Sequence, residues 1–350
     1  MSRGSSGRTV PADVLRATAQ AILQAVGTPE ASAAAVAGSL VESDLVGHES
    51  HGVRRLIPYV ANVEAGVVLP AASPEVVKTA GATAIVAGRK AFGHLAARLA
   101  AAEAARLASA HRLGMVAIEE CNHAGRLGEY VAGLAERGLV GMAFGNTDPT
   151  VAPYGGRARR LGTNPLAWAV PRAEGRPPVV MDWATSAMAE GKLAVARAWG
   201  ETVPEGVVVD RDGNRTVDPA DFYQGGALLP FGDHKGYGLS VLIEIVAGLL
   251  SGTGIGCLPG YDGLFGTVLL AVDIEAFVPL ARFREQTEDF CRALRETPTA
   301  QGAAEVLVPG EPEARTRTER VAHGVPLPGP VRDELRALAA RVGAEVTAMT

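Results

Sequence analysis

The chain of 350 residues is poor in cysteine and has no long uninterrupted apolar run. Cys121, Cys257 and Cys291 are far apart and form no C-x-x-C pair, so a disulfide framework is not expected. The longest apolar stretch, residues 239–250, contains Glu244 and is shorter than the roughly 18 residues that indicate a membrane span. These shortages favour a globular protein of a reducing compartment, without a membrane anchor.

An excess of positive charge is also missing. Thirty-three Lys and Arg against 38 Asp and Glu give a net charge of −5, which argues against a nucleic-acid partner and against a polybasic membrane patch. Residues 1–8 are polar and lack the apolar core of a signal peptide, so we expect a cytoplasmic location. The hydrophobic content of 47% excludes wholesale disorder, because enough surface can be buried to offset chain entropy.

Glycine, in contrast, is abundant. The 42 glycines make up about 12% of the 350 residues, which exceeds the average usage of about 7%. This excess indicates many tight turns or close approaches of the backbone to a ligand. They do not form a dinucleotide-binding G-x-G-x-x-G fingerprint. In the run Gly252-Thr-Gly-Ile-Gly256, Cys257 replaces the last glycine, and the run follows a predicted helix where the fingerprint would precede one. A Walker A motif and an H-E-x-x-H motif are also absent, so a metal site is not predicted.

The order of predicted elements indicates an α/β protein with an additional helical part. Residues 1–74 read as three helices, the last over 52–65, and residues 311–350 read as two more. Between them, in residues 75–310, strands and helices alternate, with strands expected at 77–86 and 305–308 among others. We therefore predict an α/β domain over 75–310 and a helical domain built from both termini.

The most informative stretch is Gly47-His-Glu-Ser-His-Gly-Val53, which continues to Tyr59. In a helix, His51, Arg55 and Tyr59 would follow one another at spacings of four and share a face. An imidazole, a guanidinium and a phenol on one stripe can bind a carboxylate and move a proton beside it. On spacing alone, a solvated helix face with an incidental histidine is the more frequent situation.

Two further stretches have the composition of anion sites. Residues 121–128 follow a predicted strand and open a helix, where backbone N–H groups can hold a phosphate, and His123 is either a proton carrier or a helix cap. The Gly-rich residues 154–165 carry Arg157, Arg159 and Arg160. These arginines could bind cofactor phosphates, and a solvated loop is an equally good interpretation.

Two charged positions lie at the edges of predicted elements. Asp182 ends a strand just before a helix, where a carboxylate can orient a histidine or cap the helix. Lys235 follows His234 among glycines at the start of a strongly apolar helix. A flexible turn of this kind is consistent with a lysine that contacts a ligand.

Taken together, five ordered motifs resemble the type-2 malate/L-lactate dehydrogenase family over nearly the whole chain. They are Gly47-His-Glu-Ser-His-Gly-Val53, Gly162-Thr-Asn-Pro-Leu-Ala167, Asp182-Trp-Ala-Thr-Ser186, Gly191-Lys192 and His234-Lys-Gly-Tyr-Gly-Leu239. The resemblance implies a fold that is not of the Rossmann type, NAD or NADP as cofactor, and a homodimer with its active sites near the subunit interface. It also accounts for the missing fingerprint.

The same resemblance implies roles for individual residues. Ser50, His51 and Asp182 would form a proton relay, and His123 matches a histidine that serves as proton acceptor in some members. We favour His51 as the acid and base, because a carboxylate partner explains its orientation. Arg55 and Tyr59 would contact the substrate. The cofactor would be contacted by His123, Ala124, Gly125, Arg126, Leu127, Thr163, Asn164, Pro165, Asp182, Trp183, Ala184, Lys235, Pro309, Gly310 and Glu311.

The sequence thus predicts an NAD(P)-dependent oxidoreductase that interconverts a small 2-hydroxy acid and its 2-oxo acid, with a small carboxylate as its partner. Reduction of the C=N bond of a cyclic or N-substituted 2-imino acid is the alternative within the same family. Two alternatives belong to other classes. One is a metal-dependent hydrolase that uses His48, His51 and His123, and the other is a catalytically silent binding protein.

Overall fold

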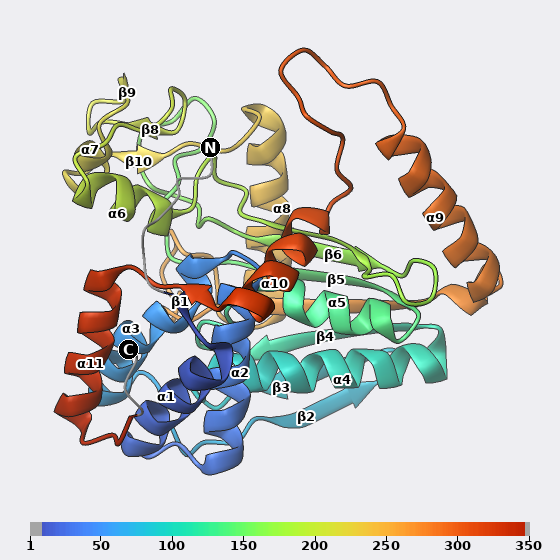
Figure 1. The fold of residues 1–350 in the computed structure, drawn as a ribbon, viewed down its shortest axis with the longest axis horizontal. Coiled ribbons are helices and arrows are strands. Elements are labelled where there is room, and N and C mark those ends of the chain that lie inside the picture. Colours follow the sequence, from blue (N-terminus) through green and yellow to red (C-terminus); the bar gives the residue numbers. More distant parts are fainter. Residues whose placement is uncertain (1–8, 347–350) are drawn as a thin grey trace.

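Short runs rich in β-branched and small apolar residues form a seven-stranded mixed sheet at the centre of the computed structural model, which describes residues 9–346 (Figure 1). Only the β3–β4 pair is parallel, and every other neighbouring pair is antiparallel. The strands, in spatial order, are β2 (Glu75–Ala80), β3 (Thr83–Ala87), β4 (Leu113–Glu119), β11 (Thr267–Asp273), β5 (Leu139–Gly145), β6 (Leu166–Val170) and β7 (Val179–Trp183).

Helices cover both faces of this sheet. The alanine-rich α4 (Gly93–His111) and α5 (Gly128–Glu136) pack on one face and α8 (His234–Leu250) on the other. The small residues allow close contact: a Cβ on Gly114 of β4 would lie 2.1 Å from the Ala104 carbonyl oxygen of α4. Glu244 of α8 is buried because its carboxylate accepts hydrogen bonds from Asn146, Asn164 and two backbone N–H groups.

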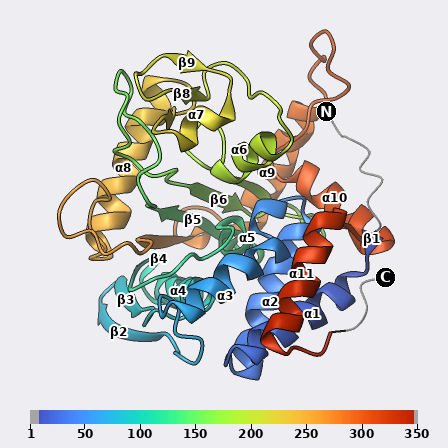
Figure 2. The same ribbon diagram turned by 90° about the vertical axis from the view of Figure 1, so that its left-hand side faces the viewer.

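Both ends of the chain build a second, helical core, as predicted (Figure 2). It contains α1 (Ala12–Ala25), α2 (Glu30–Leu45), α3 (Leu56–Glu64) and α11 (Gly329–Val342), and α10 (Glu311–His323) packs against α2. The strands β1 (Thr9–Val10) and β12 (Val325–Pro326) pair antiparallel and join the two ends. The prediction for residues 1–8 lies outside the described residues.

A smaller unit, which was not predicted, follows β7. It comprises α6 (Glu190–Ala198), α7 (Pro219–Tyr223) and a three-stranded sheet of β8 (Val208–Val209), β9 (Arg215–Thr216) and β10 (Ala227–Leu228). Its own apolar core includes Leu193, Val208 and Phe222. The remaining elements are α9 (Leu280–Arg295) and the short 3-10 helices η1 (Glu49–His51), η2 (Val53–Arg55) and η3 (Ile274–Ala276).

Three predicted elements were wrong in detail. The strand expected at 77–86 is the hairpin of β2 and β3, because Gly81 adopts a left-handed φ of 56° and reverses the chain. Residues 305–308 form no strand. The helix expected at 52–65 begins only at Leu56, since Gly52 is extended and separates η1 from η2.

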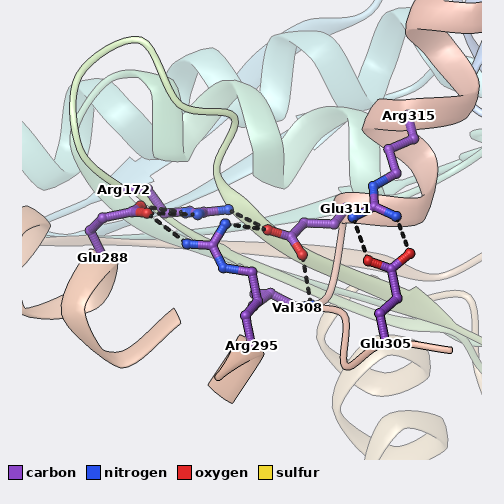
Figure 3. Close-up of polar contacts among 7 residues, drawn as sticks. All are labelled: Arg172, Glu288, Arg295, Glu305, Val308, Glu311 and Arg315. Atoms are coloured by element: carbon purple, nitrogen blue, oxygen red, sulfur yellow. Dashed lines mark hydrogen bonds and ion pairs between the residues drawn. The ribbon is translucent and has the colours of Figure 1, made fainter. Parts of the chain in front are cut away.

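A partly buried ionic network attaches α9 and α10 to the β6–β7 end of the sheet (Figure 3). The Arg172 side chain, 2% exposed, donates to both carboxylate oxygens of Glu288 at 2.9 and 3.1 Å and to Glu311 at 3.4 Å. Arg295 donates to the same two carboxylates, at 3.1 and 3.3 Å. The second oxygen of Glu311 accepts the backbone N–H of Val308 at 3.0 Å. The network therefore fixes the start of α10 against the sheet.

Candidate active site

A cavity of about 640 Å³ lies between the helical domain, the carboxyl end of β7 and the small unit. This volume falls within the range of small-molecule and cofactor sites. Thirteen of the residues predicted for the site line the cavity, and they come from four separate segments of the chain. They are Ser50, His51, Arg55, His123, Ala124, Gly125, Arg126, Leu127, Thr163, Pro165, Asp182, Trp183 and Ala184.

The segment that carries Ser50 and His51 is held by a buried aspartate. Asp44, near the end of α2, is 2% exposed, and its carboxylate accepts the Val53 N–H at 2.8 Å. A Cβ on Gly52 would lie 1.8 Å from this carboxylate, so only glycine fits there. Burial is the main cause that raises the pKa of Asp44 to about 7. The aspartate thus shapes the turn between η1 and η2 and aims the residues on either side of it.

His51 lies in this turn among cationic side chains. Its Nδ1 is 3.0 Å from the Ser50 hydroxyl oxygen, and the Arg55 Nε donates to the Ser50 carbonyl at 2.8 Å. Burial, followed by the charges of Arg55 and His48, lowers the pKa of His51 to about 3. His51 is therefore neutral near pH 7 and can accept a proton from a bound ligand.

His123 packs beside His51, with the two rings stacked at a centroid distance of 5.4 Å. Its Nδ1 is 2.7 Å from the Tyr59 hydroxyl and 3.3 Å from the Gly125 backbone nitrogen. The edge of the Phe265 ring packs against it at 5.5 Å. Burial and the Arg55 charge lower the pKa of His123 well below its ordinary value. Tyr59, predicted to contact substrate, is 4% exposed and supports His123 instead of lining the cavity.

Asp182 lines the cavity, but its expected contact with His51 is wrong. The Asp182 carboxylate accepts the Gly128 N–H at the start of α5, at 2.6 Å, and no hydrogen bond to His51 is found within residues 9–346. Burial raises the pKa of Asp182, while the Gly128 N–H and the Arg126 charge oppose the rise. The carboxylate therefore joins β7 to the 123–128 turn. It can influence His51 only through its electrostatic field.

Arg126 gives a direct observation on the ligand that the cavity suits. Its Nε is buried, and no hydrogen bond or ion pair of its guanidinium is found among the described residues. The rest of the side chain is partly exposed, and its buried N–H is costly unless an acceptor, such as an anionic group, satisfies it. The cavity therefore fits a ligand that carries negative charge, as a nicotinamide dinucleotide and a carboxylic acid both do.

The remaining predicted residues do not line this cavity. Asn164 is fully buried and bonds to Thr147, Ser240 and Glu244, so it fixes the loop that carries Thr163 and Pro165. Lys235 is exposed in the first turn of α8. The Pro309 carbonyl accepts the Val180 N–H, Gly310 precedes α10, and Glu311 belongs to the network of Figure 3.

The arginines of the Gly-rich loop also lie outside the cavity lining. Arg159 donates to the Gly226 carbonyl and stacks on Phe222 at 4.1 Å, which is a structural role in the small unit. Arg157 is 3.8 Å from Asp212, and Arg160 is exposed.

Several lining residues were missed by reasoning from the sequence. Residues 146–148 follow β5, Phe265 and Thr267 lie at the start of β11, and residues 186–192 lead into α6. Of these, Ser186 and the pair Gly191-Lys192 belong to motifs that were recognised in the sequence. Residues 146–148, Phe265 and Thr267 enter the cavity together because antiparallel pairing brings the end of β5 beside the start of β11.

A metal-dependent hydrolase would need a cluster of metal-ligating side chains. Among residues 9–346 no group of three or more His, Cys, Asp or Glu side chains is arranged to hold a metal ion. In the same part of the chain, none of the helices has the length and apolar character that a membrane span requires.

Known proteins match this chain along most of its length. A family model described as malate/L-lactate dehydrogenase matches residues 10–336. A malate dehydrogenase from Pyrococcus horikoshii is 35% identical over 347 residues, which cover 96% of each chain. The crystal structure of malate dehydrogenase from Entamoeba histolytica has a TM-score of 0.93 at 27% identity and covers 98% of this chain and 100% of that one.

A structure of delta1-piperideine-2-carboxylate reductase from Pseudomonas syringae is also similar, with a TM-score of 0.84, 31% identity, and coverage of 95% of this chain and 100% of that one. The fold and the site thus define an oxidoreductase of the dehydrogenase type. The chain belongs to the malate/L-lactate dehydrogenase family. Membership implies a nicotinamide cofactor, which agrees with the anion-binding character of the cavity.

Proposed function

We propose that the protein interconverts a small 2-hydroxy acid and its 2-oxo acid with NAD or NADP. The observation that carries the proposal is the meeting of Arg55, His51 and His123 at one cavity wall. Arg55 can bind a carboxylate, and a neutral histidine beside it can exchange a proton with the oxygen on the adjacent carbon. The bound nicotinamide supplies the chemistry of hydride transfer.

In the oxidation direction, His51 accepts the hydroxyl proton of the substrate while the hydrogen on C2 leaves as hydride. Ser50 holds the other ring nitrogen of His51 and fixes the orientation of the ring. In the reduction direction, His51 donates the proton and must therefore be protonated before hydride transfer. A bound substrate carboxylate would offset the Arg55 charge, the second largest cause of the low pKa of His51, and so would raise that pKa in the complex.

The cofactor contacts and the assembly remain proposals. We expect the cofactor to contact the 123–127 turn, residues 163–165 and the segment 182–184. We also expect contacts with Lys235 and residues 309–311, which do not line the cavity. A homodimer and a cytoplasmic location are expected as well. Sedimentation of the purified chain and cell fractionation test these last two points.

The function is tested with a substrate panel. Purified protein is given NADH or NADPH with pyruvate, oxaloacetate, 3-sulfopyruvate or delta1-piperideine-2-carboxylate, and oxidation of the cofactor is followed by absorbance. His51→Ala serves as the control for background oxidation. We expect at least one 2-oxo acid to be reduced far faster by the wild type than by the variant. Rates equal to those of the variant with every substrate would reject the proposal.

Reduction of a cyclic imino acid is kept as a second candidate because of the similarity to delta1-piperideine-2-carboxylate reductase. Both reactions need a cation for the substrate carboxylate and a group that supplies a proton, and the cavity offers both. Faster turnover of the imine than of every 2-oxo acid in the same panel would favour it.

A further inference from the structure

The hydrogen bonds of His123 determine which of its ring nitrogens carries a proton. Two groups reach Nδ1: the Tyr59 hydroxyl at 2.7 Å and the Gly125 backbone N–H at 3.3 Å. A backbone N–H can only donate, so Nδ1 must offer its lone pair. Tyr59 then donates as well. The neutral ring consequently carries its proton on Nε2, the nitrogen on the opposite side.

The residues around His123 fix the positions of its two hydrogen-bond donors. Gly125 has a left-handed φ of 74°, and a Cβ there would lie 2.5 Å from the Nε2 of His94, so the turn needs glycine. The His94 ring also packs edge-on against Tyr59 at 5.7 Å. His94 thus supports both groups that donate to His123.

The free nitrogen of His123 belongs to a ring that lines the cavity. This nitrogen, Nε2, makes no hydrogen bond with any described residue. Protonation to the imidazolium would set a ring N–H against the Gly125 N–H. The neighbouring Arg55 guanidinium disfavours the charged ring as well. Geometry and charge both keep His123 neutral.

On the basis of the proposed function, we propose that His123 is a neutral hydrogen-bond donor to the substrate carbonyl oxygen through Nε2–H, and that Tyr59 is the positioning residue that fixes this form. During reduction, a hydride forms the new C–H bond at C2, and the carbonyl π pair becomes a lone pair on oxygen. The His51 N–H bond breaks as the O–H bond forms. His123 keeps its proton throughout and stabilises the developing negative charge on oxygen.

The form of the ring can be measured in the free protein, without any assay of activity. The experiment is nuclear magnetic resonance of protein labelled with 15N-histidine, with the His123 signals assigned by their loss in His123→Gln. We expect an unprotonated Nδ1 and a protonated Nε2 at pH 7. Tyr130→Phe is the matched control, because the Tyr130 hydroxyl donates to the backbone of Ala124 in the same turn but not to the imidazole. Tyr59→Phe should change the His123 spectrum, and Tyr130→Phe should not.

Steady-state kinetics of His123 variants distinguish a hydrogen-bond donor from a general base. Gln retains an N–H donor but cannot take up a proton, so His123→Gln should keep much more of the wild-type kcat than His123→Leu. Loss of one such donor commonly lowers kcat by about 10² to 10³. Tyr59→Phe should lower kcat by less than His123→Leu and leave KM for the cofactor unchanged.

Two results would overturn the inference: a protonated Nδ1 in the free wild-type protein, or equal kcat losses in His123→Gln and His123→Leu. Failure of the proposed function is recognised separately. In that case the wild type turns over none of the panel substrates, while the spectrum of His123 still reports the form of its ring.

Discussion

Replacement of Asp44 by asparagine tests how the catalytic turn is supported. The carboxylate of Asp44 is buried and bonds to the Val53 N–H, and its pKa lies near 7 against 3.8 ordinarily. The folded chain therefore binds a proton here that the unfolded chain has released. This contribution to stability is present below pH 3.8 and is lost as the pH rises to 7. Asparagine accepts the same hydrogen bond but does not titrate.

The magnitude follows from these two pKa values. Each pH unit between them is equivalent to about 1.4 kcal/mol, so the wild type should lose about 2.5 kcal/mol more stability than Asp44→Asn between pH 5 and pH 8. Other titrating groups, such as His51 and His94, affect both proteins alike. Their contributions cancel when the two pH profiles are subtracted.

The assay is equilibrium unfolding in urea, followed by circular dichroism at pH 5, 6, 7 and 8. The exposed Asp13 offers a matched control, since Asp13→Asn removes the same charge outside the core. Its profile should run parallel to that of the wild type. If Asp44→Asn also runs parallel to the wild type, Asp44 does not hold a proton in the fold, and the reasoning about this turn is refuted.

Four further outcomes are expected. Gly52→Ala should abolish most turnover, because its Cβ would lie 1.8 Å from the Asp44 carboxylate; normal kcat would contradict this packing. Arg55→Ala should raise KM for the 2-oxo acid more than it lowers kcat in steady-state kinetics. Arg172→Met should lower the free energy of unfolding in urea by less than the about 3–5 kcal/mol that an uncompensated buried charge costs, since Glu288 and Glu311 keep Arg295 as a partner. A pH profile of kcat/KM for hydroxy-acid oxidation should show no inflection near 6.5, because His51, with its pKa of about 3, stays neutral.

Local patterns predicted most of the regular elements, since periodicity and helix-end residues act within a few positions. The helical core made by both ends followed from the matching character of the terminal segments. The two-residue strands of the small unit left no periodic signal. The hairpin of β2 and β3 was missed because a single glycine reversed a run that otherwise reads as one strand.

The site illustrates a different limit. Motif order identified Ser50, His51, Arg55 and His123, and these residues meet at the cavity. The helical stripe predicted for His51, Arg55 and Tyr59 was wrong, because the buried carboxylate of Asp44 imposes the break at Gly52. Contacts of this kind depend on the tertiary fold, as does the pairing of Asp182 with Gly128 in place of His51.

The proposed function requires that a hydride is transferred to C2 of a 2-oxo acid in this cavity. The most direct test uses a reduced cofactor deuterated at C4 on the face that is transferred, with the best substrate of the panel and mass spectrometry of the product. We expect a 2-hydroxy acid with one deuterium at C2 from the wild type, and almost no product from His51→Ala. A hydroxy acid without the label, or equal labelled product from both proteins, would contradict it.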